Sequence, residues 1–188
     1  MGREPFGRSF FEQPVDVVAH ELIGSHMIVH GEGRVFDAQV IETEAYGGLD
    51  DPASHAFRGP TPRSTIMFGP AGHLYVYRIY GIHWCMNVVT QEAGSASAVL
   101  LRAAIIHQIG ANADLSETPT VICRGPGNLT RILSITGDDN GTDCCAKAGR
   151  VVFVRSTNET ESRVVGQSTR VGVSHAKERR SRYFLEGI

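Results

Sequence analysis

A carboxylate and a phenol ring stand two residues apart at Glu44 and Tyr46, where an apolar stretch gives way to a loop rich in glycine and proline. In an extended strand, residues i and i+2 project to the same face, so these two side chains are expected to lie together. A carboxylate beside an aromatic wall suits the activation of a water molecule next to a stacked ring. The same pattern is also typical of a solvated strand end, so the pair alone leaves both interpretations open.

Two further polar residues interrupt apolar runs. Arg102 is the only charged residue between positions 98 and 106, and an unpaired charge in a core strand is too costly to bury. We therefore expect Glu44 or Glu42 on a neighbouring strand to pair with it, although a purely structural salt bridge has the same signature. Asn87 stands among the apolar residues of 85–89, where it either satisfies backbone groups or lines a pocket.

Aromatic residues gather in the segment 74–91. Two β-rich runs, 74–80 and 82–91, are separated by little more than Gly81, which predicts a tight β-hairpin with Tyr80 and Gly81 at its tip. Tyr75 and Tyr77 share one face, and cross-strand packing is sufficient to account for them. Tyr80 has little core to pack against. An exposed aromatic on a ribbon flanked by arginines has the form of a wedge that enters a nucleic-acid groove.

The other chemical signatures are weak. His55, His73 and His83 together with Glu44 offer a metal hypothesis, but these histidines do not stand in the spacings typical of metal ligands. The sequence has no G-x-S-x-G nucleophile motif, no phosphate-binding P-loop and no G-x-G-x-x-G. We expect neither a metal nor another cofactor.

Length and composition indicate an ordinary globular protein. The 188 residues predict one domain spanning 1–188, with hydrophobic and aromatic shares of 41% and 7%. No run of about 18 apolar residues is present, so no membrane span is expected. The first ten residues lack the apolar core of a signal peptide, and the cysteines lack metal-binding spacing, which favours the cytoplasm.

The charge is unevenly distributed. The net charge is −2, yet residues 52–91 contain no Asp or Glu while carrying Arg58, Arg63 and Arg78, and residues 163–182 form a second basic stretch. Locally positive surface attracts phosphates even on a mildly acidic protein. All 18 cationic residues except Lys147 and Lys177 are arginines, whose planar fork suits phosphate recognition.

The pattern of elements predicts an α+β fold, mainly an antiparallel curved β-sheet with a protruding hairpin and a few packing helices. Besides the hairpin, strands are expected at 34–46, 95–106, 150–154, 169–176 and 181–187. Helices are expected at 13–25, and at 125–136 with Gly137 as its end. The segment 47–65 is a long loop, and loops of this length in compact domains are usually functional or disordered.

Taken in order, these segments resemble the alkyladenine (3-methyladenine) DNA glycosylases, a monofunctional family without a helix-hairpin-helix motif, and in particular its bacterial members. The resemblance spans nearly the whole chain and rests on "VIETEAYGG", "DPASHAFRGPTPRSTIMFGPAGHLYVYRIYGIHWCMNVV", "AVLLRA", "GPGNLTRIL" and "RVGVSHA". The ending "KERRSRYF" departs from the family pattern, as do Trp84 and the longer segment "VTQEAGSAS".

The resemblance implies a role for each residue singled out above. Glu44 matches the general base that activates water against C1′ of the deoxyribose, and Arg102 matches the arginine that holds this water and the carboxylate. The expected substrate-binding residues are Tyr46, His55 and Tyr77, which stack on the flipped base, and Asn87, which meets its edge. The expected DNA-binding residues are Tyr80, which fills the gap left in the duplex, and Ile82 and Arg63.

The resemblance also implies an activity: excision of alkylated or deaminated purines from double-stranded DNA by base flipping and hydrolysis, as the first step of base excision repair. The expected enzyme is a monomer that needs no cofactor, has no lyase activity, and works in the bacterial cytoplasm at the nucleoid. Two alternatives belong to other classes. One is a nucleic-acid-binding module of similar fold without base release, and the other is a metal-dependent hydrolase built on His55, His73 and His83.

Overall fold

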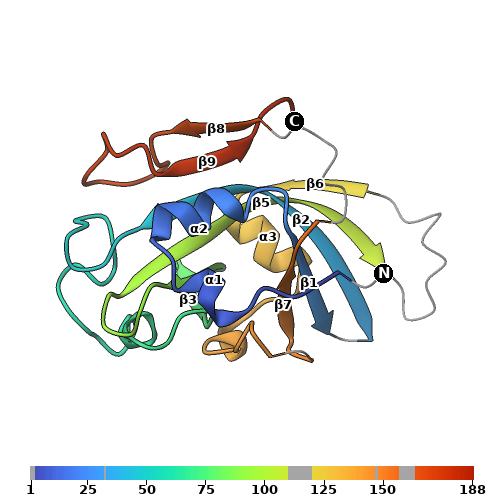
Figure 1. The fold of residues 1–188 in the computed structure, drawn as a ribbon, viewed down its shortest axis with the longest axis horizontal. Helices are drawn as coiled ribbons and strands as arrows, with labels where there is room; N and C mark the ends of the chain where they lie inside the picture. Colours follow the sequence, from blue (N-terminus) through green and yellow to red (C-terminus); the bar gives the residue numbers. More distant parts are fainter. Residues whose placement is uncertain (1–2, 32, 110–119, 147, 157–163) are drawn as a thin grey trace.

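A computed structural model of the chain describes residues 3–31, 33–109, 120–146, 148–156 and 164–188. Within these residues, nine strands form one curled sheet in which every neighbouring pair is antiparallel (Figure 1). The strands are β1 His26–Gly31, β2 Arg34–Tyr46, β3 Leu74–Ile79, β4 His83–Thr90, β5 Ser97–Ile109, β6 Thr120–Arg124, β7 Val151–Val154, β8 Val165–Ser168 and β9 Arg182–Leu185.

The two longest strands, β2 and β5, lie at the centre of the sheet. The order is β3-β4-β5-β2-β1-β7, with β6 also paired to β5, and β9 paired to both β2 and β8. Because β9 pairs with Glu42, Thr43 and Glu44 of β2, the C-terminal part of the chain lies directly beside the predicted catalytic carboxylate.

An irregularity interrupts the pairing of β2 with β5 next to this carboxylate. The register shifts between Val40 and Glu42 and again between Glu42 and Thr43, so Arg102 has no directly opposite partner in the ladder. Bulges of this kind re-aim side chains and are frequent beside active sites. Beyond the irregularity, Leu100 pairs with Glu44, which puts Arg102 on the same face of the sheet as Glu44.

Three short helices pack on the sheet: α1 Arg8–Phe11, α2 Val15–Glu21 and α3 Pro126–Ile132, together with the 3₁₀ turns η1 Thr65–Phe68 and η2 Gly137–Asp139. Helix α2 buries Val18, and Leu22 at its C-terminal end is buried in the same core, while α3 contributes Leu129. At seven residues, α2 and α3 are the longest helices in the described part of the chain, far short of the ~20 residues that cross a bilayer.

The predicted α+β class with a mainly antiparallel curved sheet is confirmed. The strand at 34–46, the hairpin, the strand at 95–106, and the strands at 150–154 and 181–187 are all present within a few residues. Strands β1, β6 and β8 were not predicted.

Two predicted elements differ from the structure. Residues 169–176 form no strand but an irregular segment that crosses from β8 towards β9. Helix α3 ends at Ile132, before Gly137, because Ser134 adopts a left-handed φ of 53° and the Ile135 N–H bonds the Thr130 carbonyl at 2.9 Å. Gly137 has a different role: a Cβ there would lie 2.7 Å from the Trp84 ring.

Candidate active site

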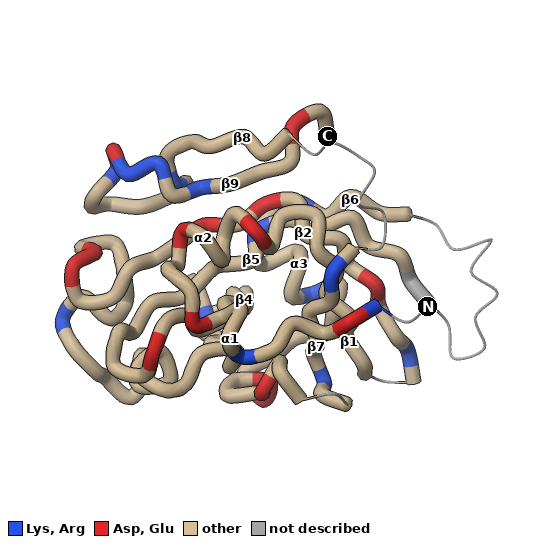
Figure 2. The backbone as a smooth tube through the Cα atoms, in the orientation of Figure 1, with Lys and Arg blue, Asp and Glu red and all other residues tan. Residues whose placement is uncertain are grey.

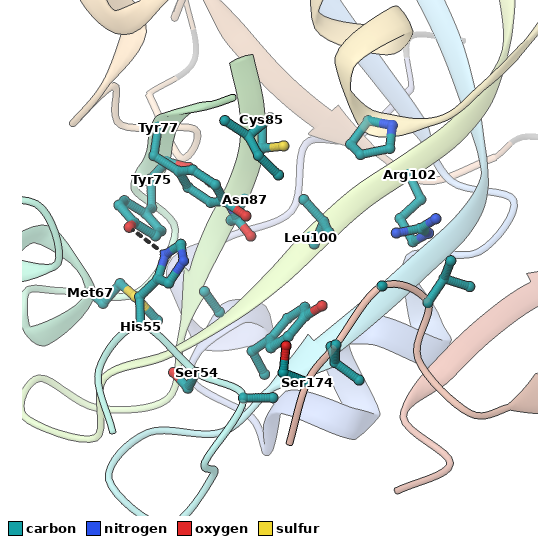
Figure 3. Close-up of a pocket in the computed structure, with 18 of the residues that line it drawn as sticks. Ser54, His55, Met67, Tyr75, Tyr77, Cys85, Asn87, Leu100, Arg102 and Ser174 are labelled. Carbon is teal, nitrogen blue, oxygen red and sulfur yellow. Dashed lines mark hydrogen bonds between the residues drawn. The ribbon is translucent and has the colours of Figure 1, made fainter. Parts of the chain in front are cut away.

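A cavity of about 500 Å³ lies at the ends of the central strands, within the usual size of small-ligand sites. Its walls come from segments far apart in the sequence. Strands β2 to β5 form one part, and the loop after β2, the N-terminus of α3 and residues 171–175 form the rest. Figure 3 shows His55, Tyr75 and Tyr77 gathered on one side of the cavity and Arg102 on the other.

Glu44 is fully buried, and both of its carboxylate oxygens accept hydrogen bonds. The backbone N–H of Val171 donates to Oε1 at 2.7 Å. The Tyr46 hydroxyl donates to Oε2 at 2.8 Å, and Arg102 Nη1 donates to the same oxygen at 3.3 Å. Glu44 does not line the cavity itself, but all three of these partners do. The carboxylate therefore lies one hydrogen bond behind the cavity wall.

Arg102 pairs with both of the carboxylates that the sequence offered as alternatives. Its Nε donates to Glu42 Oε1 at 2.8 Å while its Nη1 reaches Glu44. Burial acts to lower the pKa of Arg102, but the Glu44 and Glu42 carboxylates outweigh it and raise that pKa.

Arg182 of β9 extends this network. It donates from Nε to the same Glu42 oxygen at 2.7 Å and from Nη1 to Ser168 Oγ at 3.0 Å. Although burial opposes the shift, hydrogen bonds from Arg182 and Arg102 hold the pKa of Glu42 below its usual range. Two carboxylates and two guanidinium groups thus face one another, and their formal charges balance.

His55, Tyr75 and Tyr77 form one aromatic wall. The Tyr75 hydroxyl and His55 Nδ1 are 2.8 Å apart, and the ring centroids of His55 and Tyr77 are 4.6 Å apart with planes at 73°. A base between two rings needs about 7 Å, twice the usual contact distance, so no base fits between His55 and Tyr77. These two predicted stacking residues lie on the same wall, and Tyr46 lies on the side of Glu44 and Arg102.

Burial favours the uncharged forms of the tyrosines and the histidine that line the cavity. Burial raises the pKa of Tyr75 to about 12 and that of Tyr77 further. Burial and then the Glu44 carboxylate raise the pKa of Tyr46, so its hydroxyl stays available as a donor. Partial burial of the His55 ring, followed by the nearby Arg63 guanidinium, lowers the pKa of His55.

Asn87 satisfies both expectations that its sequence context raised. It is 4% exposed, lines the cavity, and donates from Nδ2 to the Tyr75 carbonyl at 3.0 Å. This bond fixes the plane of its amide against β3.

The hairpin tip projects from the cavity rim. Tyr80 is 86% exposed and Ile82 is 69% exposed, the two highest values among the large apolar side chains of the described residues. Tyr80 also lines the cavity. Arg63 lies outside the lining, with its guanidinium 4.6 Å from the Tyr77 ring centroid and a 3.2 Å hydrogen bond to the Arg78 carbonyl.

The basic stretch near the C-terminus is largely engaged within the molecule. Figure 2 shows Lys and Arg positions in blue gathered at one end of the β8–β9 hairpin. Arg179 and Arg180 donate to the carbonyls of Asp50 and Gln167, at 2.9 and 2.6 Å, and Arg163 lies outside the described residues.

Seven of the predicted site residues meet at the cavity or directly behind its wall: Glu44, Tyr46, His55, Tyr77, Tyr80, Asn87 and Arg102. Arg63 and Ile82 are not among the residues that line it. The histidines of the metal hypothesis do not meet, because His73 and His83 are absent from the lining. In the described ranges no three His, Cys, Asp or Glu side chains gather as metal ligands.

Two contributors to this geometry are not identified by the sequence. Tyr75 holds His55, and its spacing of two from Tyr77 was the available signal, although packing explained it equally well. Val171 acts through its backbone N–H, which leaves no trace in side-chain chemistry.

Comparison with known proteins gives one consistent result. The sequence profile of the family described as "Methylpurine-DNA glycosylase (MPG)" matches residues 9–188. A protein of Frankia casuarinae named "Putative 3-methyladenine DNA glycosylase" is 50% identical over 147 residues, which cover 75% of this chain and 66% of the relative. Proteins of the same name from Rhodopseudomonas palustris (strain BisB18) and Methanoculleus marisnigri are 43% identical over 183 residues and 40% identical over 185 residues. These alignments cover 96% and 95% of this chain, and 86% and 94% of the two relatives.

Proposed function

Because the chain belongs to the methylpurine-DNA glycosylase family, we propose that it releases alkylated or deaminated purines from double-stranded DNA. The proposed substrates are 3-methyladenine, 7-methylguanine, hypoxanthine and ethenoadenine. Hydrolysis of the N-glycosidic bond leaves a free base and an abasic site, which is the first step of base excision repair. Residues 1–188 act as one glycosylase domain, as a monomer in the cytoplasm at the nucleoid.

Glu44 is the general base of this reaction. It takes a proton from a water molecule as the water oxygen bonds to C1′, and the purine leaves with the electron pair of the broken C1′–N bond. A positioned general base contributes about 10²- to 10⁴-fold in rate. The same carboxylate stabilises the positive charge that develops on the sugar, and Arg102 orients it through the 3.3 Å hydrogen bond.

The aromatic cavity receives the base once it has been rotated out of the duplex. Flipping costs a few kcal/mol, and stacking on an aromatic side chain returns about 1–3 kcal/mol per base. A methylated purine carries positive charge and gains further attraction to the tyrosine faces. The lowered pKa of His55 supports this proposal, since a neutral imidazole does not repel such a base. Tyr80 enters the gap that the base leaves.

One observation carries the proposal: a buried carboxylate is held by Tyr46, Arg102 and Val171 directly behind a cavity walled by His55 and Tyr77. An unpaired carboxylate on a strand end would be solvated, and a purely structural salt bridge would not need an aromatic cavity beside it.

In the experiment, the protein is incubated with duplexes that each carry one lesion, with chelator present and no added cofactor. The released free base is measured by chromatography. The wild-type protein is expected to release the damaged base. Glu44→Gln is expected to bind the same duplex and release base at least about 100-fold more slowly, because it cannot accept the proton.

Glu21→Gln is the matched control, since the Glu21 side chain is 53% exposed and distant in sequence from the site, and its rate is expected to equal that of the wild type. Borohydride is expected to trap no covalent complex, since Lys177 does not line the cavity. Binding without release from any lesion would instead support a nucleic-acid-binding module. An unchanged rate in Glu44→Gln would remove Glu44 from its role.

A further inference from the structure

Arg170 and Asp51 form a buried ion pair behind the cavity. Their side chains are 0% and 1% exposed, and the contact is bidentate: Arg170 Nη1 donates to Asp51 Oδ2 at 2.5 Å and Nη2 donates to Oδ1 at 3.0 Å. A guanidinium with no exposed surface cannot contact a DNA phosphate. Arg170 therefore differs from the other arginines of the C-terminal basic stretch.

The contacts of Arg170 converge on the strand end that carries Glu44 and Tyr46. Its Nη1 also donates to the carbonyl of Ala45, the residue between them, at 3.2 Å. Its guanidinium carbon lies 4.8 Å from the centroid of the Tyr46 ring. The next residue, Val171, donates its N–H to Glu44. One side chain thus supports both the stacking ring and the segment that binds the carboxylate.

Asp51 connects this strand end to the loop that carries His55. Its Oδ2 accepts a hydrogen bond from the Gly47 N–H at 3.0 Å, and its Oδ1 accepts one from the Ala53 N–H at 3.1 Å. Arg170 and Asp51 together join the loop after β2, the end of β2 and the irregular segment 169–176. These are three of the segments that wall the cavity.

Stability alone is a poor explanation for such a pair. Replacing a buried ion pair with neutral residues of similar volume is often neutral or stabilising, whereas removing one partner leaves an uncompensated buried charge. The Nε of Arg170 is buried and has no hydrogen-bond partner, which adds to the desolvation cost of the pair.

We propose that Arg170 and Asp51 are positioning residues that hold the Val171 N–H on Glu44 and the Tyr46 ring at the cavity wall. This inference rests on the proposed function and deepens it, because it assigns the glycosylase a support for its general base and its stacking ring. Neither residue touches the substrate. The pair acts by fixing the geometry of groups that do.

The test separates positioning from stability with a neutral double variant. Arg170→Met and Asp51→Asn are each expected to lower Tm, because Asp51→Asn leaves the buried Arg170 unpaired and Arg170→Met leaves Asp51 with only the 4.0 Å contact to Arg179. The double variant Asp51→Asn/Arg170→Met is expected to recover most of the lost Tm. Its single-turnover rate of base release, at saturating protein and well below Tm, is expected to stay about 10- to 100-fold below that of the wild type.

A second measurement needs no DNA. Amide hydrogen exchange at Val171 is expected to be at least about tenfold faster in the double variant than in the wild type, because the segment is no longer tied to β2. Arg170→Lys provides a variant that keeps the positive charge opposite Asp51 but loses the bidentate fork, and it is expected to show both the slower release and the faster exchange.

Arg150→Met is the matched control. Arg150 pairs with Asp139 at 3.1 Å and bonds the Ser134 carbonyl, and it does not line the cavity. It is expected to lower Tm without changing base release or Val171 exchange. A double variant that releases base at the wild-type rate would overturn the positioning role of the pair. Unchanged amide exchange at Val171 in the double variant would overturn the inference, whether or not the wild-type protein releases base. Failure of the wild-type protein to release any base would contradict the proposed function but not the positioning role.

Discussion

The Glu44 carboxylate is sealed from solvent by the groups that hold it. Tyr46, Arg102 and Val171 lie between the carboxylate and the cavity. A water molecule that contacts Glu44 from the cavity must therefore bind next to one of these three groups. The Tyr46 hydroxyl belongs to a side chain whose ring is proposed to contact the base. Substrate binding and access to the carboxylate therefore share one side chain.

Removing only the Tyr46 hydroxyl separates these two contributions. Tyr46→Phe keeps the ring but loses a hydrogen bond to a carboxylate, an interaction worth about 1.5–3 kcal/mol. We expect base release to slow by about tenfold or more while the affinity for lesion-containing duplex stays near that of the wild type. Single-turnover kinetics and equilibrium binding measure the two quantities. Tyr46→Leu, which also removes the ring, is the control and should weaken binding to the lesion-containing duplex as well as slow base release. Equal losses of affinity in Tyr46→Phe and Tyr46→Leu would show that the hydroxyl and the ring do not contribute separately.

Among the elements, the β3–β4 hairpin contributes both to the cavity and to an exposed tip. Its inner part supplies Tyr75, Tyr77 and Asn87 to the cavity, and its tip presents Tyr80 and Ile82 to solvent. The distance between cavity and tip is set by the antiparallel register, in which Ile79 pairs with His83.

Shortening the side chain at the tip should affect duplexes selectively. Tyr80→Ala removes a ring that is proposed to replace a lost base in the stack, a contact worth about 1–3 kcal/mol. We expect weaker binding to damaged duplex, and a smaller loss with a single strand of the same sequence, because a single strand has no gap to fill. Val121→Ala, at an exposed residue of β6, is the control and should change neither. Equal losses on duplex and single strand would argue against the wedge.

Elements whose conformation depends on nearby residues could be predicted from the sequence. The hairpin follows from two β-rich runs around Gly81, and the contact of Glu44 with Tyr46 follows from the period of a strand. The pairing of Arg102 with Glu42 and Glu44 follows from the cost of a buried charge.

The segment 169–176 could not be predicted in this way. Its alternating apolar residues are typical of a strand, but its backbone is held by partners more than a hundred positions away: Arg170 contacts Asp51, and Val171 contacts Glu44. Local pattern carries no information about such partners. For the same reason, the sequence predicted a site at Glu44 but not that the carboxylate would be sealed behind the cavity wall.

At the scale of the whole molecule, paired carboxylates connect distant parts of the chain. Asp37 bonds His26 and Arg3, Glu42 joins β2 to β5 and β9, and Asp51 joins the loop after β2 to Arg170. Burial acts to raise the pKa of all three carboxyl groups, but the hydrogen bonds that they accept outweigh it and lower each pKa below the ordinary value.

These shifts predict sensitivity to acid. A carboxyl group whose pKa is depressed by folding stabilises the protein above its unfolded pKa of about 4, and this stabilisation is lost as the pH falls through the folded value. We expect the urea midpoint of unfolding to fall most steeply below about pH 4. Asp51→Asn/Arg170→Met should lose less stability over that range, since one such group is gone. Equal midpoints at pH 6 and pH 3 would contradict the expectation.

The backbone at Tyr80 has a consequence for the stability of the hairpin tip. Its φ of 53° is a left-handed conformation that costs a side-chain-bearing residue roughly 1–2 kcal/mol and that asparagine or glycine adopts more easily. A tyrosine at this position therefore lowers the stability of the tip, and its proposed entry into the duplex accounts for its presence there. Stability and the proposed contact with DNA thus place opposite demands on the residue at the hairpin tip.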